Sequence, residues 1–269
     1  MTDFGRELAV ARQLARDAGT IVLELRSGEL GVEMKKGDEP VTVADRRASE
    51  LIVGGLAEAF AGDQVVSEEL PTGSSLDTTR VWLVDPIDGT KDYIRGGDGF
   101  SVMIGLVCDG RPVLGVVYQP TLDRTYFATP AGAFIETDGA TAPLHVSAVA
   151  NAGEARLVAS ASHRTATIDD VKSRLGIADE QNVGSVGVKL CLIAQASRDL
   201  YVNPTAKTKA WDTCAPEAIL VGAGGRLTDL GGALVDYSVV APRRGLIASN
   251  TRIHDEVVAK LAPLFANRA

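Results

Sequence analysis

Cysteine and histidine are both scarce in this chain of 269 residues. The cysteines have no spacing typical of a metal site and lie in apolar stretches, so we expect buried free thiols in a reducing cytoplasm. The histidines are scattered, and no Ser/His or Cys/His arrangement indicates a covalent nucleophile or a zinc site. The residues concerned are Cys108, Cys191, Cys214, His145, His163 and His254.

Long apolar runs are absent as well. No stretch approaches the roughly 20 apolar residues that a membrane-spanning helix needs. The charged N-terminal segment lacks the pattern of a signal peptide, and its apolar residues recur on one face, which predicts an amphipathic helix ending near Gly28. A hydrophobic content of 45% indicates a globular protein, either one large domain or two tightly packed halves.

Positive charge is in deficit. The 27 Lys and Arg residues against 35 Asp and Glu residues give a formal net charge of −8. This balance argues against binding of nucleic-acid polymers, and we expect a small-molecule partner and no membrane. An acidic site would repel a phosphate ester unless metal ions reversed the local sign, so action on phosphates would require metal.

The expected secondary structure differs between the two halves of the chain. The first half has a second helix at about 44–60 and then strands in meander order, with a hairpin signal at Asp109-Gly110. These strands are expected near 65 and at 81–84, 100–107, 112–118 and 124–128, continuing to 134. The second half alternates strands and helices, which favours an α/β layer. Its strands are expected at 156–160, 200–202 and 245–248, and its helices at 168–175, 188–196, 216–222 and 253–265.

We therefore predict a layered fold of the α/β (α+β) class, with an antiparallel N-terminal sheet and a mixed C-terminal sheet. A boundary near residue 150 would separate an N-terminal half, residues 1–150, from a C-terminal half, residues 151–269.

The most informative segment is Asp85-Pro-Ile-Asp-Gly-Thr90, which directly follows the apolar run 81–84. Pro86 restricts the backbone and Asp88-Gly89 favours a tight reversal, so two carboxylates should meet at a rigid corner. Like charges held so close need a cation between them or raised pKa values. Oxygen ligands without cysteine or histidine suit Mg²⁺, although a simple turn would use the same residue types.

Two other acidic positions fall at the ends of expected elements. Glu68 and Glu69 follow the apolar residues 64–66, and Asp212 precedes the expected helix 216–222. Taken singly, the glutamates indicate a solvated loop tip and Asp212 a helix N-cap. Together with the corner at Asp85, they favour a metal site.

These motifs resemble the signatures of the lithium-sensitive, magnesium-dependent phosphatase superfamily, which includes inositol monophosphatase and the 3'(2'),5'-bisphosphate nucleotidases. The resemblance extends over 36–45, Ser67-Glu-Glu69, Asp85-Pro-Ile-Asp-Gly-Thr90 and Trp211-Asp-Thr-Cys-Ala-Pro216. It implies alternating helix and sheet layers of the sugar-phosphatase type, with the active site where the halves meet. It further implies a homodimer, lithium sensitivity and two or three Mg²⁺ ions. The implied ligands are Glu68, Asp85, the carbonyl of Ile87, Asp88 and Asp212.

The same resemblance implies catalytic roles near the corner. Thr90 and Glu68 would orient the attacking water, Asp45 would pair with Thr90, and Gly89 and Thr90 would offer backbone N–H groups to the phosphate. Without the resemblance, Thr90 would be interpreted as a helix N-cap and Asp45 as an exposed acid in a first helical turn.

The substrate is predicted from finer similarities. Ser162-His163 and Gly184-Ser-Val-Gly-Val-Lys189 resemble the nucleotide-binding segments of bisphosphate nucleotidases, which implies substrate contacts from His163, Ser185 and Lys189. Lys189 could equally be a solvated helix residue, and Asn203-Pro204 stands where some nucleotidases have an arginine. We predict hydrolysis of adenosine 3',5'-bisphosphate to AMP and phosphate, with inositol 1-phosphate or a related sugar phosphate as the alternative substrate. A catalytically silent scaffold remains a third hypothesis.

Overall fold

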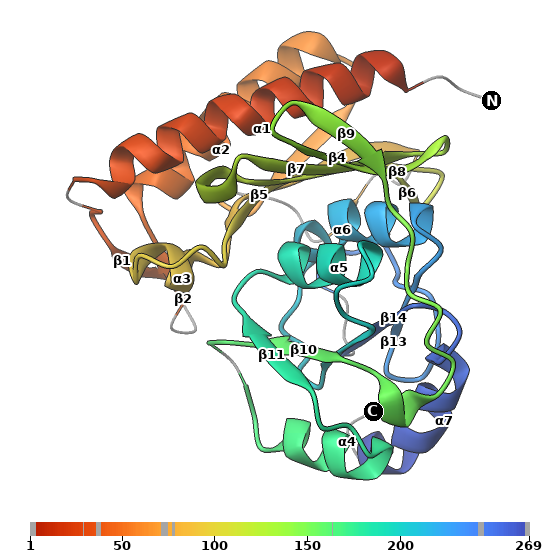
Figure 1. Ribbon diagram of the computed structural model, residues 1–269. Helices are drawn as coiled ribbons and strands as arrows, with labels where there is room; N and C mark the ends of the chain where they lie inside the picture. The colour runs from red at the N-terminus through yellow and green to blue at the C-terminus, as the bar shows by residue number, and fades with distance from the viewer. Residues whose placement is uncertain are drawn as a thin grey trace.

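The computed structural model describes residues 4–28, 30–35, 39–70, 75–76, 79–162, 164–241 and 245–266. Helices and sheets alternate in layers: a helix pair, a large sheet, a second helix pair, a smaller sheet and a third helix pair (Figure 1). The paired helices are α1 (Gly5–Arg26) with α2 (Val43–Ala59), α5 (Val186–Ala194) with α6 (Ala210–Gly222), and α4 (Thr167–Leu175) with α7 (His254–Phe265). None of the described helices is both long and apolar enough to cross a membrane.

The large sheet has seven strands in sequential order, and its strands are antiparallel except for the first pair, which is parallel. The expected meander is therefore confirmed, with β9 as an unexpected edge strand. The strands are β3 (Gln64–Ser67), β4 (Arg80–Asp88), β5 (Ser101–Cys108), β6 (Arg111–Gln119), β7 (Arg124–Thr129), β8 (Gly132–Thr137) and β9 (Ala140–Pro143).

The smaller sheet is mixed, as predicted. β10 pairs in parallel with β11 and β12, whereas β14 pairs antiparallel with β12 and β13. Its strands are β10 (Leu157–Ser160), β11 (Glu180–Val183), β12 (Leu200–Asn203), β13 (Arg226–Asp229) and β14 (Leu246–Ser249). The strands β11 and β13 were not expected, because they carry more polar side chains than the other strands of this sheet.

Three short elements and two 3-10 turns complete the described structure. A hairpin of β1 (Glu33–Lys35) and β2 (Glu39–Val41) lies beside the short helix α3 (Thr90–Ile94) (Figure 1). The 3-10 turns are Pro120–Leu122 and Ala152–Glu154.

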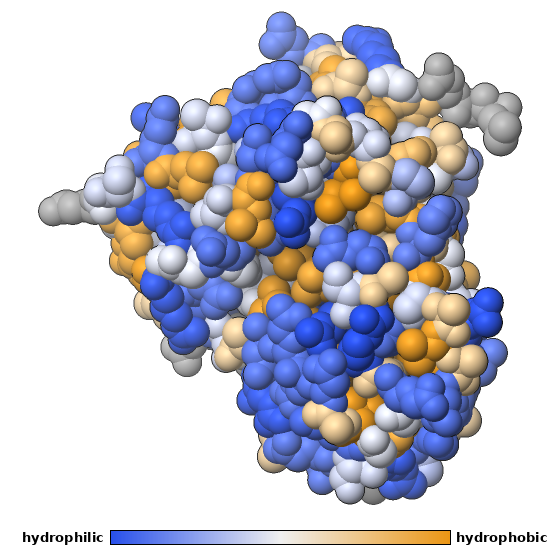
Figure 2. Space-filling view, in the orientation of Figure 1, coloured by the Kyte–Doolittle hydropathy of each residue, from blue (hydrophilic) through white to orange (hydrophobic). Residues whose placement is uncertain are grey.

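The continuous apolar run in β4 reflects burial on both faces of the large sheet. Trp82 and Val84 point into the core beneath α1 and α2, whereas Val81 and Leu83 point into the core shared with α5 and α6. That shared core includes residues of both sheets, so the two halves of the chain are held together by common burial. Figure 2 shows apolar side chains at the waist between the upper and lower parts of the molecule.

Helix α6 lies very close to the large sheet because two glycines face it. Gly105 and Gly115 are cross-strand partners on β5 and β6. A Cβ atom at Gly115 would lie 2.1 Å from the backbone oxygen of Ala215, and one at Gly105 would lie 2.5 Å from the sulfur of Cys214. Since α6 carries Asp212, these glycines determine how closely this carboxylate approaches β4.

We expect Gly115→Ala to destabilise the fold by about 2 kcal/mol, because the new methyl group meets rigid backbone. The matched control is Gly54→Ala on α2, where a Cβ meets nothing within 4 Å and should stabilise the helix by about 0.5 kcal/mol. Denaturant unfolding of both variants measures the difference. An unchanged midpoint for Gly115→Ala would contradict this close-approach argument.

Candidate active site

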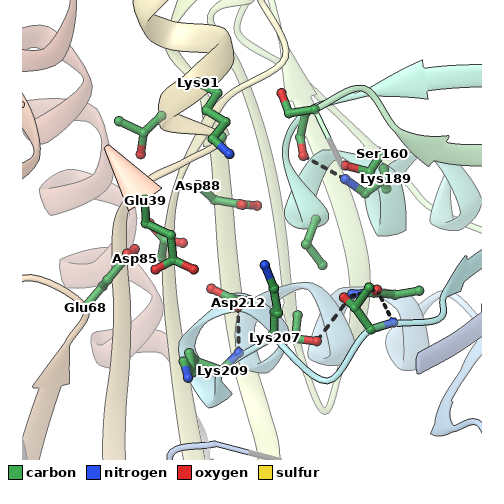
Figure 3. Close-up of a pocket in the computed structure, with 18 of the residues that line it drawn as sticks. Glu39, Glu68, Asp85, Asp88, Lys91, Ser160, Lys189, Lys207, Lys209 and Asp212 are labelled. Carbon is green, nitrogen blue, oxygen red and sulfur yellow. Dashed lines mark hydrogen bonds between the residues drawn. The ribbon is translucent and has the colours of Figure 1, made fainter. Parts of the chain in front are cut away.

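A cavity of about 430 Å³ lies between the two halves of the chain and collects most of the predicted site residues. Its walls come from β1 and β2, from β4 and α3, from β10, β12 and α5, and from α6 with the loop before it (Figure 3). The predicted residues that line it are Glu68, Asp85, Ile87, Asp88, Gly89, Thr90, Lys189 and Asp212. Asp45 and Ser185 lie directly behind this lining, whereas His163 lies outside the described residues.

The corner after β4 has the rigid geometry that its sequence predicts. The pairing of β4 with β5 shifts register between Asp85 and Asp88, because Pro86 cannot donate a ladder hydrogen bond. The side chain of Asp85 turns back to accept from the backbone N–H of Ile87 at 3.0 Å. Both carboxylates therefore face the cavity from one short segment (Figure 3).

Asp88 is held by the second half of the chain. Its Oδ2 accepts from the hydroxyl of Ser185 at 2.6 Å and from the N–H of Gly187 at 2.8 Å, both at the start of α5. The Ser185 hydroxyl also lies 3.0 Å from that of Ser101. Ser185 is fully buried and its hydroxyl is already paired, so it orients Asp88 in this structure.

Asp212 approaches from α6, but it is not the N-cap that the sequence indicated. The helix begins earlier than expected, at Ala210, which makes Asp212 its third residue. Its Oδ2 accepts from the backbone N–H of Lys209 at 2.7 Å, so the carboxylate caps the helix from inside its first turn. The other oxygen remains for the cavity.

Glu68 and Glu69 share one cation and do not form a simple solvated tip. The ammonium group of Lys35 lies 2.9 Å from Glu68 and also pairs with Glu69. Burial raises the pKa of Glu69 to about 7, although the hydrogen bond from Lys35 opposes this shift.

Thr90 and Asp45 form the hydrogen-bonded pair that the resemblance implied. Thr90 begins α3, with Gly89 as its N-cap. The Thr90 hydroxyl can donate to Oδ1 of Asp45 at 3.2 Å or to the carbonyl of Ile87 at 3.0 Å. Asp45 is in a first helical turn but only 1% exposed, so the expectation of an exposed acid is wrong. Its other oxygen accepts from the N–H and hydroxyl of Thr42, which fixes its position.

The carboxylates in this cavity oppose one another electrostatically. The pKa of Asp85 is raised well above its usual value by burial and then by Glu68, Asp88 and Asp212. Burial and the charge of Asp88 likewise raise the pKa of Asp212. Such a group of buried oxygen ligands fits a hard divalent cation such as Mg²⁺.

The ligand set is nevertheless not assembled in advance. Within the described ranges, no three acidic, histidine or cysteine side chains are grouped closely enough to hold a metal ion as they stand. Asp85, Asp88, Asp212 and Glu68 each accept a hydrogen bond from a protein donor instead. Asp85, Asp88, Asp212 and Glu68 nevertheless line one cavity, where the charges of Glu68, Asp88 and Asp212 raise the pKa of Asp85.

Lys189 is 1% exposed, so the alternative of a solvated lysine is wrong. Its ammonium group donates to the carbonyls of Val183 and Gly184 at 3.2 and 2.7 Å and lies 5.3 Å from the ring centre of Tyr201. Burial lowers its pKa to about 8.

Sequence reasoning missed several other polar residues of the cavity, which are Glu39, Lys91, Ser160, Arg164, Lys207 and Lys209. The last two lie within four residues before the Trp211-Asp212 signature, which could have indicated them.

We expect Asp85→Asn to stabilise the metal-free protein at pH 8, because it removes one of the repelling charges. The pKa of Asp85 is raised by folding, so the ionised group costs stability, and this cost grows as pH rises above the unfolded value. The amide oxygen keeps the hydrogen bond from Ile87. In thermal unfolding with chelator, the melting temperature of Asp85→Asn should be about 3 °C higher than that of the wild type. This is the shift that a gain of roughly 1 kcal/mol in the free energy of unfolding gives in a chain of this size.

The control for this change is Asp170→Asn, at an exposed position of α4. Mg²⁺ should raise the melting temperature of the wild type more than that of Asp85→Asn. A destabilised Asp85→Asn protein in chelator would show that carboxylate repulsion does not dominate the cavity.

Comparisons with known proteins agree on one family. The model of the inositol monophosphatase family matches residues 6–264. A protein of Salmonella typhimurium named 3'(2'),5'-bisphosphate nucleotidase CysQ is 36% identical, over 90% of this chain and 96% of its own. A histidinol-phosphatase of Mycobacterium tuberculosis is 35% identical, over 95% of this chain and 97% of its own. Among solved structures, an IMPase of Thermotoga maritima has a TM-score of 0.84 at 27% identity, covering 98% of this chain and all of the other. The chain therefore belongs to the inositol monophosphatase family of phosphate-ester hydrolases.

Proposed function

We propose that the protein is a Mg²⁺-dependent phosphomonoesterase that hydrolyses adenosine 3',5'-bisphosphate to AMP and phosphate. The observation that carries this proposal is the mixed lining of the cavity. Glu68, Asp85, Asp88 and Asp212 line it together with basic side chains that include Lys189 and Lys207. The carboxylates suit metal ions beside the phosphate that is cleaved, and the basic side chains suit a substrate with further negative charge.

Glu68, Asp85, Asp88, Asp212 and the carbonyl of Ile87 are the groups that we propose to hold the metal, as two or three ions. Bound Mg²⁺ neutralises the charge of a phosphate and lowers the pKa of a water molecule beside it. The protein supplies the rest of the chemistry by orienting the reacting groups.

Thr90 is the group that we propose to orient the attacking water. When its hydroxyl donates to Asp45, its oxygen can accept a hydrogen bond from a water molecule in the cavity. Asp45 cannot rotate away, because Thr42 holds its second oxygen. Gly89 and Thr90 lie at the start of α3, where first-turn N–H groups have no partner within the helix and can bind phosphate oxygens.

The preference for a nucleotide bisphosphate is supported by the CysQ relatives, which are named as bisphosphate nucleotidases. Inositol 1-phosphate remains the alternative, because solved structures of inositol monophosphatases have the same fold. Histidinol phosphate is a further candidate, supported by the relative from Mycobacterium tuberculosis.

We further propose a cytoplasmic homodimer that is inhibited by lithium. The cytoplasmic location is supported by Cys108, Cys191 and Cys214, which are all free thiols. The dimer and lithium inhibition remain predictions from the resemblance. The division into residues 1–150 and 151–269 remains a prediction from the change in secondary-structure pattern between the two halves.

Phosphate release from adenosine 3',5'-bisphosphate, inositol 1-phosphate and histidinol phosphate should rise with Mg²⁺ concentration and be highest with the bisphosphate. Steady-state kinetics on the full chain give kcat/KM for each substrate. Background release at every Mg²⁺ concentration would support the silent-scaffold hypothesis. A higher kcat/KM for inositol 1-phosphate would identify the alternative function.

Thr90→Ala should lower kcat by roughly 10²-fold or more, because it removes the hydroxyl that would orient the water. Thr90→Ser is the matched control, since it keeps the hydroxyl and should retain most of the activity. Equal losses in both variants would mean that Thr90 acts through its methyl group and packing.

A further inference from the structure

Six basic side chains line the cavity, and they differ in whether they are free to bind a ligand. Most are already paired: Lys35 binds two glutamates, Arg164 binds Asp169 and Glu180, and Lys189 donates to two carbonyls. Lys91 also has an interaction of its own. The remaining two are Lys207 and Lys209.

Lys207 points into the middle of the cavity (Figure 3). It projects from the loop between β12 and α6 into the space between Asp212 and Lys189, whereas the side chain of Lys209 lies to one side of Asp212. Among the described residues, the ammonium group of Lys207 has no hydrogen-bond or ion-pair partner. Its three donors are therefore available to a ligand in the cavity.

The loop that carries Lys207 is held at both ends. On the side of β12, the side-chain oxygen of Asn203 accepts from the N–H and the hydroxyl of Thr205 at 3.0 and 2.8 Å. On the side of α6, the N–H of Lys209 donates to Asp212. Thr208, between these anchors, is buried. This anchoring restricts the positions that the Lys207 side chain can reach.

A substrate with two phosphates needs a basic group for the phosphate that does not lie beside the proposed metal ligands. Carboxylates that hold metal can accommodate the phosphate to be cleaved, but a second phosphate dianion beside them would be repelled. Lys189 is a poor partner for it, because two of its three N–H donors are committed and its burial disfavours the charged form.

We propose that Lys207 binds the second phosphate of the substrate, the one that is not hydrolysed, and so determines the preference for bisphosphates over monophosphates. This inference rests on the proposed nucleotidase function.

The first test compares two substrates that share the phosphate to be cleaved. Adenosine 3',5'-bisphosphate has the second phosphate and adenosine 3'-monophosphate lacks it. Lys207→Met should raise KM for the bisphosphate about tenfold or more, the effect of losing one charged hydrogen bond, and leave kinetics with the monophosphate nearly unchanged. Lys207→Arg should keep most of the preference, because it keeps the charge.

Lys260→Met on α7 is the matched control, since Lys260 is exposed and pairs only with Glu256 on its own helix in the described structure. It should change neither substrate's kinetics. Equal losses on both substrates in Lys207→Met would place Lys207 at the phosphate that is cleaved and overturn the inference. An unchanged preference would overturn it as well.

A binding measurement separates this inference from the proposed function. Calorimetry with AMP and with adenosine, in wild type and Lys207→Met, measures the contribution of the spared phosphate without turnover. We expect the substitution to weaken AMP binding and to leave adenosine binding unchanged. If the wild type releases no phosphate from the bisphosphate, the proposed function fails. If it does release phosphate but AMP binding is insensitive to Lys207→Met, only the role of Lys207 fails.

Discussion

The mutual repulsion of buried carboxylates is the constraint on which the rest of this structure depends. Asp85, Asp88 and Asp212 are removed from water and share one cavity, so each makes ionisation of the others less favourable. A group of this kind costs stability in the free protein, and a bound cation offsets the cost. Stability and metal binding should therefore be linked in this protein.

The local hydrogen bonds show how the fold tolerates this repulsion. Each of the three carboxylates accepts from a backbone N–H group, of Ile87, Gly187 or Lys209, so none is left without a donor. One of these hydrogen bonds, from Gly187 to Asp88, joins the two halves of the chain. The site thus exists only while both halves are docked, and the shared core between the sheets keeps them docked.

Close packing of α6 against the large sheet is the second requirement. The glycine pair Gly105 and Gly115 allows backbone to touch backbone, and α6 brings Asp212 to the same cavity as the corner after β4. The start of α6 also anchors the loop that carries Lys207, because the N–H of Lys209 donates to Asp212. A proposed metal ligand and the proposed specificity residue are therefore positioned by a single packing contact.

Much of the molecule was predictable from local sequence. Short apolar runs separated by turn signals predicted the meander of β5, β6, β7 and β8, because such runs are typical of buried strands. Short polar strands such as β11 and β13 escaped prediction, since their place in the sheet depends on neighbours far away in the chain.

The sequence by itself determined the rigid corner at Asp85 and Asp88, because Pro86 and Gly89 restrict the backbone wherever the segment lies. It also indicated, through resemblance, which distant acids should join that corner. Only the tertiary structure decided that Asp45 is buried behind Thr90, that Ser185 holds Asp88, and that Lys189 is already paired while Lys207 is free among the described residues. Burial and pairing of a side chain depend on which elements pack around it, and local sequence does not contain that information.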